Sequence, residues 1–103
     1  MEKKLLSINE LEKKVENIKK SKKKIILVSG VFDLVHLGHI KYFSAAKKLG
    51  DILIVSLTTD EYVRKGFNRP AFTHFQRAEV LSAIKYVDFI VFSKDFNLSL
   101  IHI

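Results

Sequence analysis

Three apolar runs along the chain alternate with segments whose apolar residues recur at helical spacing. The runs Ile25–Ser29, Ile52–Thr58 and Val87–Ser93 are rich in aliphatic and β-branched residues and predict buried strands. The intervening segments Ile40–Leu49 and Phe75–Ile84 predict helices. Because strands and helices alternate, we expect right-handed crossovers between parallel strands. The pattern therefore predicts an α/β fold with a parallel sheet.

The first 24 residues predict a basic amphipathic helix followed by a linker. Ser7 and Glu10 have the spacing of a capping box at a helix start. One helical face then collects the apolar residues Ile8, Leu11, Val15 and Ile18. Nine lysines against four glutamates give this segment +5 of the chain's net charge of +7. Because no aromatic residue is interleaved with these lysines, we interpret them as a solvated face rather than a nucleic-acid site.

The segment between the second and third strands shows turn and capping signals. A short helix is predicted over Asp60–Arg64, and Lys65–Phe72 contains glycine, asparagine and proline, as loops do. Thr73 and Gln76 have the spacing of a second capping box. His74, between them, is interpreted only as a residue of the helix start.

Composition narrows the class of protein. At 103 residues the chain is one small domain, and the absence of cysteine excludes disulfides and thiolate metal sites. No apolar stretch approaches the roughly 18 residues of a membrane span. The charged N-terminus lacks the apolar core of a signal peptide. We therefore expect a cytoplasmic protein that neither crosses a membrane nor binds nucleic acid.

The segment Gly30–His39, which reads G-V-F-D-L-V-H-L-G-H, joins a predicted strand to a predicted helix. His36 and His39 stand three residues apart, with Gly38 between them. A helix N-terminus presents free backbone N–H groups and a partial positive charge. Imidazoles beside it can donate further hydrogen bonds to phosphate oxygens. The motif makes nucleotide chemistry the leading hypothesis.

Several residues of this motif also have structural or competing interpretations. Gly30 is expected where the backbone approaches a ligand and Gly38 where a side chain would crowd phosphate, although turn geometry alone also favours glycine. Phe32 is interpreted as a core residue. Three roles remain open for Asp33: it orients the turn, it contacts a ligand amine, or it contacts a metal held by phosphates. With the two histidines it would offer three metal ligands, but the surrounding basic residues favour an anion.

Ligands bind outside the carboxyl ends of the strands of an open parallel sheet, and three segments should meet there. One is the histidine motif, and another is Thr59 with Asp60 after the second strand. The third is the basic loop with Lys65 and Arg69, where positive charge has no packing purpose. Arg77 either joins them from the following helix or belongs to a solvated helix face.

Further segments match one family in order and spacing: H-I-K-Y-F-S-A-A-K-K-L-G-D, I-V-S-L-T-T-D-E, N-R-P and Q-R-A-E-V-L-S-A-I-K-Y-V-D. Over about residues 25–92 the chain resembles the cytidylyltransferase-like nucleotidyltransferases, which carry an H-x-G-H signature. L-L-S-I-N-E-L and K-G-F-N-R-P are most similar to the adenylyltransferase domain of ADP-heptose synthases. H-I-K-Y-F and T-T-D-E-Y are similar to glycerol-3-phosphate cytidylyltransferases. The resemblance implies a Rossmann-like parallel sheet with flanking helices, incomplete here and preceded by the amphipathic helix.

The resemblance also implies a reaction. AMP or CMP would pass from a nucleoside triphosphate, ATP or CTP, to a sugar or polyol phosphate, with release of pyrophosphate. Mg²⁺ would bridge the phosphates, carried by the nucleotide more than by the protein. Because members of this family often form dimers, a homodimer is one expected state.

The same similarity implies roles for individual residues. The implied catalytic residues are His36, His39, Lys65 and Arg77. The implied nucleotide-binding residues are Gly30, Val31, Phe32, Asp33, Gly38 and His39. The implied substrate-binding residues are Thr59, Asp60 and Arg69. No residue is assigned as a metal ligand.

One part of the family pattern is absent from this sequence. Family members continue with further strands and a second motif, of the type I-S-T-S, at a helix start. Residues 25–97 are therefore expected to be the N-terminal part of a nucleotidyltransferase domain truncated at its C-terminus. Leu98–Ile103 is interpreted as a non-native tail translated from a library adaptor, with a genuine apolar strand exit as the alternative. An inactive nucleotide-binding or assembly module is the alternative function.

Overall fold

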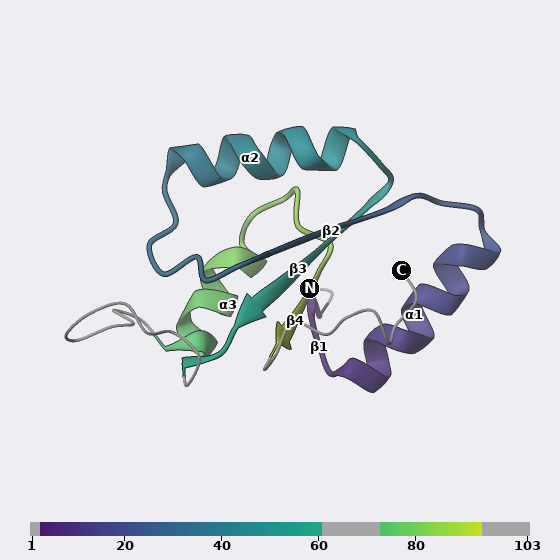
Figure 1. Cartoon of the computed structure of the whole chain (residues 1–103), viewed down its shortest axis with the longest axis horizontal. Helices are drawn as coiled ribbons and strands as arrows, with labels where there is room; N and C mark the ends of the chain where they lie inside the picture. The colour runs from purple at the N-terminus through teal and green to yellow at the C-terminus, as the bar shows by residue number, and fades with distance from the viewer. Residues whose placement is uncertain (1–2, 61–72, 94–103) are drawn as a thin grey trace.

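The structure, a computed structural model, describes residues 3–60 and 73–93 (Figure 1). Its elements in chain order are β1 (Leu5–Leu6), α1 (Ile8–Lys20), β2 (Ile25–Gly30), α2 (Leu37–Lys48), β3 (Ile52–Thr58), α3 (His74–Ser82) and β4 (Phe89–Ser93). The helix expected after Asp60, the loop Lys65–Phe72 and the tail Leu98–Ile103 lie outside the described residues. No helix within the described ranges is long and apolar enough to span a membrane.

The described strands form one parallel sheet in the order β1-β4-β3-β2. At its carboxyl edge Gly30 of β2 lies opposite Leu57 of β3, and Thr58 of β3 lies opposite Ser93 of β4. The α/β class, the parallel sheet and its Rossmann-like arrangement are thereby confirmed. The register places the segments that follow β2, β3 and β4 beside one another.

Strand β1 was missed by the sequence analysis. Leu5 pairs with Ile90 and Leu6 with Val91 of β4, so the N-terminal segment extends the sheet before α1 begins. A two-residue strand is too short to show any periodicity, and its pairing joins positions 85 residues apart in the chain. No local signal distinguishes such a strand from a linker.

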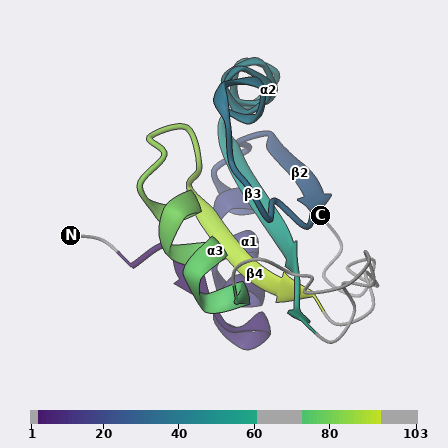
Figure 2. The ribbon, with the colours of Figure 1, turned by 90° about the vertical axis from the view of Figure 1, so that its left-hand side faces the viewer.

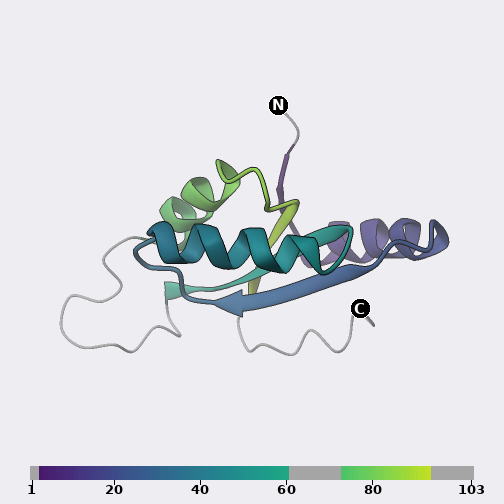
Figure 3. The same ribbon diagram turned by 90° about the horizontal axis from the view of Figure 1, so that it is seen from above.

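Helices α2 and α3 cover one face of the sheet. Phe43 of α2 and Leu81 of α3 are fully buried against Val55 and Leu57 of β3. Figure 2 shows α3 in front of β4 with α1 behind the sheet, and Figure 3 shows α2 running above β2 and β3. Each such buried side chain stabilises the fold by about 1.5–3 kcal/mol.

Helix α1 packs on the opposite face, as its apolar stripe predicts. Leu11 and Val15 are buried against Ile54 of β3 and Val91 of β4. Ile8 is the exception, because it remains 40% exposed at the start of the helix. The strand residues alternate between the two faces, so the sheet is covered on both sides.

Both predicted capping boxes are confirmed. Ser7 Oγ accepts from the Glu10 amide at 3.1 Å, and the Glu10 carboxylate accepts from the Ser7 amide at 3.0 Å. Thr73 and Gln76 make the equivalent pair at 3.2 and 3.0 Å at the start of α3. These reciprocal bonds satisfy amides that have no partner inside the helix.

Two predicted boundaries were wrong. Helix α2 begins at Leu37 rather than Ile40, because His36 itself caps it. Strand β4 begins at Phe89 rather than Val87. The Val87 amide instead donates to the Ile84 carbonyl at 3.2 Å and closes a turn.

Asp88 connects three elements at the amino edge of the sheet. Its Oδ2 accepts from the Leu53 amide of β3 at 2.7 Å and from Lys47 Nζ of α2 at 2.5 Å. The Asp88 amide in turn donates to the Leu53 carbonyl at 3.0 Å. Lys47 Nζ also donates to the Asp51 carbonyl, so this ammonium links the end of α2 to the start of β3.

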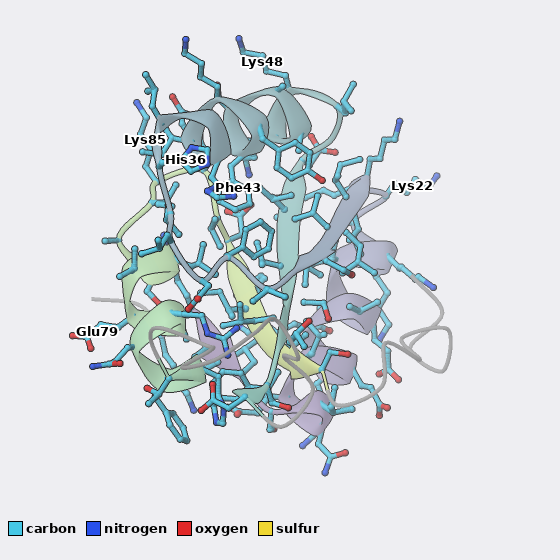
Figure 4. All side chains as sticks on the ribbon, turned by 60° about the vertical axis from the view of Figure 1, so that its left-hand side comes forward. Lys22, His36, Phe43, Lys48, Glu79 and Lys85 are labelled. Carbon is cyan, nitrogen blue, oxygen red and sulfur yellow. The ribbon has the colours of Figure 1, made fainter. Side chains whose placement is uncertain are left out.

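We expect Asp88→Ala to destabilise the fold by about 1–3 kcal/mol, because the Leu53 amide and the Lys47 ammonium lose their shared acceptor. Urea denaturation followed by circular dichroism measures this change. Glu79→Gln, at an exposed position on α3, is the matched control and should change stability by less than about 0.5 kcal/mol (Figure 4). Equal stability of the two variants would contradict the role assigned to Asp88.

Candidate functional site

The turn from β2 to α2 is built around Phe32. Its backbone adopts a left-handed conformation with φ of 50°, which is uncommon for a bulky residue. The Phe32 ring packs against His39 at a centroid distance of 5.5 Å and against Phe43 at 5.2 Å. Such a strained residue is tolerated where surrounding contacts hold it, and it is often found at functional sites.

Gly30 is required by this ring. A Cβ at Gly30 would lie 2.8 Å from two atoms of the Phe32 ring, closer than any real contact. Packing of the Phe32 ring is thus sufficient reason for a glycine here, and the expected approach of a ligand to the Gly30 backbone stays a prediction. Phe32 itself is partly buried against the core, as predicted.

The two histidines form a capping box at the start of α2. His36 Nδ1 accepts from the Gly38 amide at 3.0 Å, and His39 Nδ1 accepts from the His36 amide at 3.1 Å. A neutral imidazole whose Nδ1 accepts a hydrogen bond carries its proton on Nε2. Each ring thus uses one nitrogen to begin the helix and keeps Nε2–H as a donor.

Gly38 allows the His36 ring to fold over the helix start. A Cβ at Gly38 would lie 2.7 Å from His36 Cε1. The sequence predicted that a side chain at position 38 would crowd bound phosphate. In the structure such a side chain would first displace the His36 imidazole. The glycine therefore serves the histidine cap.

The expectation of free amides at the start of α2 is corrected for Gly38, His39 and Ile40. The Gly38 amide is bonded to an imidazole, and the His39 and Ile40 amides both donate to the His36 carbonyl at 2.9 and 3.2 Å. An anion at this helix start would meet imidazole Nε2–H groups in preference to these amides. The donors at this helix start that no backbone contact uses are therefore the imidazole Nε2–H groups.

The imidazoles lie close together and differ in their surroundings. Their centroids are 4.1 Å apart, and His39 is partly buried beside Phe32. His36 is exposed at the start of α2 (Figure 4). Burial, with a smaller contribution from the nearby His36 charge, lowers the pKa of His39 below its ordinary value of 6.5. The lowered pKa favours the neutral form of His39, in which its Nδ1 can accept from the backbone.

Arg77 is buried, so the alternative of a solvated helix face was wrong. Its side chain is 1% exposed, and Nη1 donates to the carbonyls of Val31 at 2.8 Å and Thr58 at 2.7 Å. Nη2 donates to Asp60 Oδ1 at 2.7 Å. The guanidinium thus brings together the β2–α2 turn, the end of β3 and the Asp60 carboxylate.

A cavity of about 290 Å³ lies between the β2–α2 turn and α3. Its lining residues are Phe32, Asp33, Leu34, Val35, Gln76, Arg77 and Val80. The structure therefore places Asp33, Phe32 and Arg77 around one space at the carboxyl side of the sheet.

Among the remaining predicted site residues, the structure describes Thr59 but not Lys65 or Arg69. Thr59 is 3% exposed, and its amide donates to the Ser93 carbonyl at 3.4 Å across the end of the sheet. Lys65 and Arg69 lie outside the described residues. Within the described ranges no three His, Asp or Glu side chains come close enough to hold a metal ion. The alternative with Asp33 and both histidines as metal ligands thus has no geometric support there.

His74 is the residue whose position the sequence analysis did not anticipate. Its Nδ1 lies 3.2 Å from both the amide nitrogen and Oδ2 of Asp60. The two residues are 14 positions apart, and His74 appeared only to begin a helix. No pattern in the sequence relates them, because their proximity depends on how α3 packs beside the end of β3.

Comparison with known families finds one match over most of this chain. The profile of the family described as cytidylyltransferase-like matches residues 27–101. The matched region begins in β2 and includes the histidine cap, Asp60 and Arg77.

Curated relatives align over nearly the whole chain. The bifunctional protein HldE of Campylobacter jejuni subsp. jejuni serotype O:6 is 48% identical over an alignment 103 residues long, which covers 97% of this chain and 22% of that protein. The protein of the same name from Desulfatibacillum aliphaticivorans is 45% identical over 93 residues, covering 87% and 19%. The chain thus spans about a fifth of the length of these curated relatives.

A solved structure shares the fold. The lipopolysaccharide core biosynthesis protein from Thermoplasma volcanium superposes with a TM-score of 0.67 and 33% sequence identity. The similarity covers 76% of this chain and 64% of that one.

We expect Arg77→Met to destabilise the fold by about 3 kcal/mol, because a buried carbonyl, a partly buried carbonyl and a carboxylate lose their donor. Chemical denaturation measures the change. Lys48→Met, at an exposed position on α2, removes the same charge from the surface and should be nearly neutral (Figure 4). A variant at Arg77 as stable as the Lys48 variant would contradict the buried network.

We expect the stability of the wild-type chain to fall more steeply on acidification than that of His39→Gln. Folding lowers the pKa of His39, so its contribution is full above 6.5, the unfolded value, and is lost as the pH falls through the folded pKa. Denaturation midpoints measured between about pH 7.5 and 5 test this difference. Parallel profiles for the two proteins would contradict it.

Proposed function

Since the chain belongs to the cytidylyltransferase-like family, we propose that it transfers AMP or CMP from ATP or CTP to a phosphorylated sugar or polyol. In this reaction a phosphate oxygen of the acceptor attacks the α-phosphorus of the nucleotide. The bond from the α-phosphorus to the oxygen bridging to the β-phosphorus breaks, and pyrophosphate leaves. No covalent enzyme intermediate is needed, so catalysis depends on positioning and charge stabilisation.

The paired histidine cap is the observation that carries this proposal. Both Nδ1 atoms are committed to backbone amides, which orients the rings and directs the remaining proton to Nε2. Two preorganised donors can stabilise the negative charge that grows on the phosphate oxygens during displacement. We assign His36 and His39 this role.

Arg77 and Asp60 are assigned a supporting role beside the histidines. Arg77 donates to the Val31 carbonyl, so it holds the turn that carries the histidine cap. It also binds the Asp60 carboxylate, which is 35% exposed and can accept hydrogen bonds from acceptor hydroxyl groups. In place of the catalytic role that the resemblance implies for Arg77, we propose that it holds the frame of the site. Lys65 remains a proposed catalytic residue, and Arg69 remains a proposed substrate-binding residue.

The carboxylates and imidazoles of the described residues fit Mg²⁺ that is already bound to the nucleotide when it enters the site. Within the described ranges the chain forms no cage of carboxylates or imidazoles, and Mg²⁺ in such sites is bound by one or two carboxylates and the substrate phosphates. Asp33, at the cavity beside the histidine cap, is the carboxylate that would meet it. When bound, the ion neutralises triphosphate charge.

The relatives support a sugar phosphate as acceptor over other phosphates. The solved relative is named for lipopolysaccharide core biosynthesis, and lipopolysaccharide cores consist of sugars. The HldE proteins are bifunctional by name, in keeping with a transferase domain joined to another activity. Catalysis in the cytoplasm and assembly as a homodimer are further parts of the proposal.

Release of pyrophosphate tests this proposal. The chain is incubated with Mg²⁺, ATP or CTP, and either a heptose phosphate or glycerol 3-phosphate. We expect His36→Ala and His39→Ala each to lower kcat about 100-fold or more, the effect of removing one preorganised donor. Lys48→Ala, at an exposed position of the same helix, should keep full activity.

Activity unchanged in both histidine variants would refute the assigned roles. Saturable binding of ATP or CTP by calorimetry, without pyrophosphate release from any acceptor, would favour the alternative of a nucleotide-binding or assembly module.

A further inference from the structure

His74 lies against Asp60 in a position that its role at a helix start does not require. The reciprocal capping box of Thr73 and Gln76 already caps the start of α3 without the His74 side chain. The His74 imidazole instead points at the segment after β3, where Nδ1 is 3.2 Å from the Asp60 amide and 3.2 Å from Asp60 Oδ2. The contact therefore calls for an explanation other than helix capping.

Aromatic neighbours hold the imidazole in place. Its ring lies 4.5 Å from Phe75, the next residue of α3, and 4.7 Å edge-on from Phe92 of β4. The side chain of His74 is only 21% exposed. Contacts from a helix and from the central sheet thus restrict the ring, so that little rotamer entropy is lost when Nδ1 binds.

The two oxygens of the Asp60 carboxylate consequently have different neighbours. Arg77 Nη2 donates to Oδ1 at 2.7 Å, and Oδ2 faces His74 Nδ1. Arg77 is itself anchored on backbone carbonyls of the β2–α2 turn and of β3. The carboxylate is therefore held between a buried cation and a restricted imidazole, while about a third of the side chain remains exposed.

Both protonation states of His74 orient Asp60, through different atoms. A neutral ring with its proton on Nε2 accepts from the Asp60 amide and fixes the backbone. A protonated ring donates from Nδ1 to Oδ2 and fixes the carboxylate. A phenylalanine at this position would retain the ring contacts but neither hydrogen bond.

We propose that His74 is a positioning residue, which orients the Asp60 carboxylate toward the hydroxyl groups of a phosphorylated sugar acceptor. This role rests on the proposed function, in which Asp60 binds the acceptor. It adds a specificity determinant that lies on α3, on the side of Asp60 toward β4. The histidine cap, at the start of α2, is assigned to the nucleotide.

Two substitutions separate hydrogen bonding from ring packing. His74→Phe keeps an aromatic ring between Phe75 and Phe92 and removes Nδ1. His74→Asn removes the ring and keeps a polar atom near the position of Nδ1. Glu79→Gln, on the exposed side of α3, is the control for any change of charge or side chain on this helix.

In the pyrophosphate assay we expect His74→Phe to raise KM for the heptose phosphate about tenfold, the effect of one lost hydrogen bond. The KM for the nucleotide and kcat should change much less. His74→Asn should restore most of the affinity for the acceptor. A KM for the acceptor that is unchanged in His74→Phe, or raised equally in both variants, would overturn the proposal.

A second measurement is independent of activity. Hydrogen exchange of the Asp60 amide, followed by NMR in the whole chain, should accelerate in His74→Phe and stay slow in His74→Asn and Glu79→Gln. Exchange in His74→Phe at the wild-type rate would overturn the positioning role even where turnover is seen. An absence of pyrophosphate release with every acceptor would refute the proposed function alone, because exchange of the Asp60 amide still reports on the contact with His74.

Discussion

The buried guanidinium of Arg77 is the interaction on which the arrangement of the site depends. It donates to the Val31 carbonyl in the β2–α2 turn, to the Thr58 carbonyl at the end of β3 and to the Asp60 carboxylate. Removing a partner from such a buried network is costly, so the joined segments keep a fixed geometry. The histidine cap and Asp60, which belong to different strand ends, are thereby held on one frame through a single side chain of α3.

At the start of α2 the same residues shape the backbone and supply the chemistry. Phe32 takes a left-handed backbone conformation and requires Gly30, while the His36 ring requires Gly38. In this structure the residues of the H-x-G-H signature shape the start of α2. Nδ1 of each imidazole accepts from a backbone amide at the helix start, and Nε2 keeps the proton of the neutral ring as a donor.

Much of the fold followed from local signals. The β-branched runs predicted the parallel strands β2, β3 and β4, and both Ser or Thr capping boxes were found where the helices begin. The start of α2 was misplaced by three residues, because histidine is not a usual capping residue. The motif predicted a histidine pair at a helix start, and the profile match supports the family resemblance. Arg77 was left between two interpretations, because arginine at that spacing is equally typical of an exposed helix face.

The sequence by itself determined the elements and the identity of the chemical groups, because periodicity, capping and turn formation act over a few neighbouring residues. Only the tertiary structure decided that Leu5 and Leu6 extend the sheet, that Arg77 is buried, and that His74 meets Asp60. These facts depend on packing between positions 14 to 85 residues apart in the chain, and no local pattern encodes which distant partner a side chain will meet.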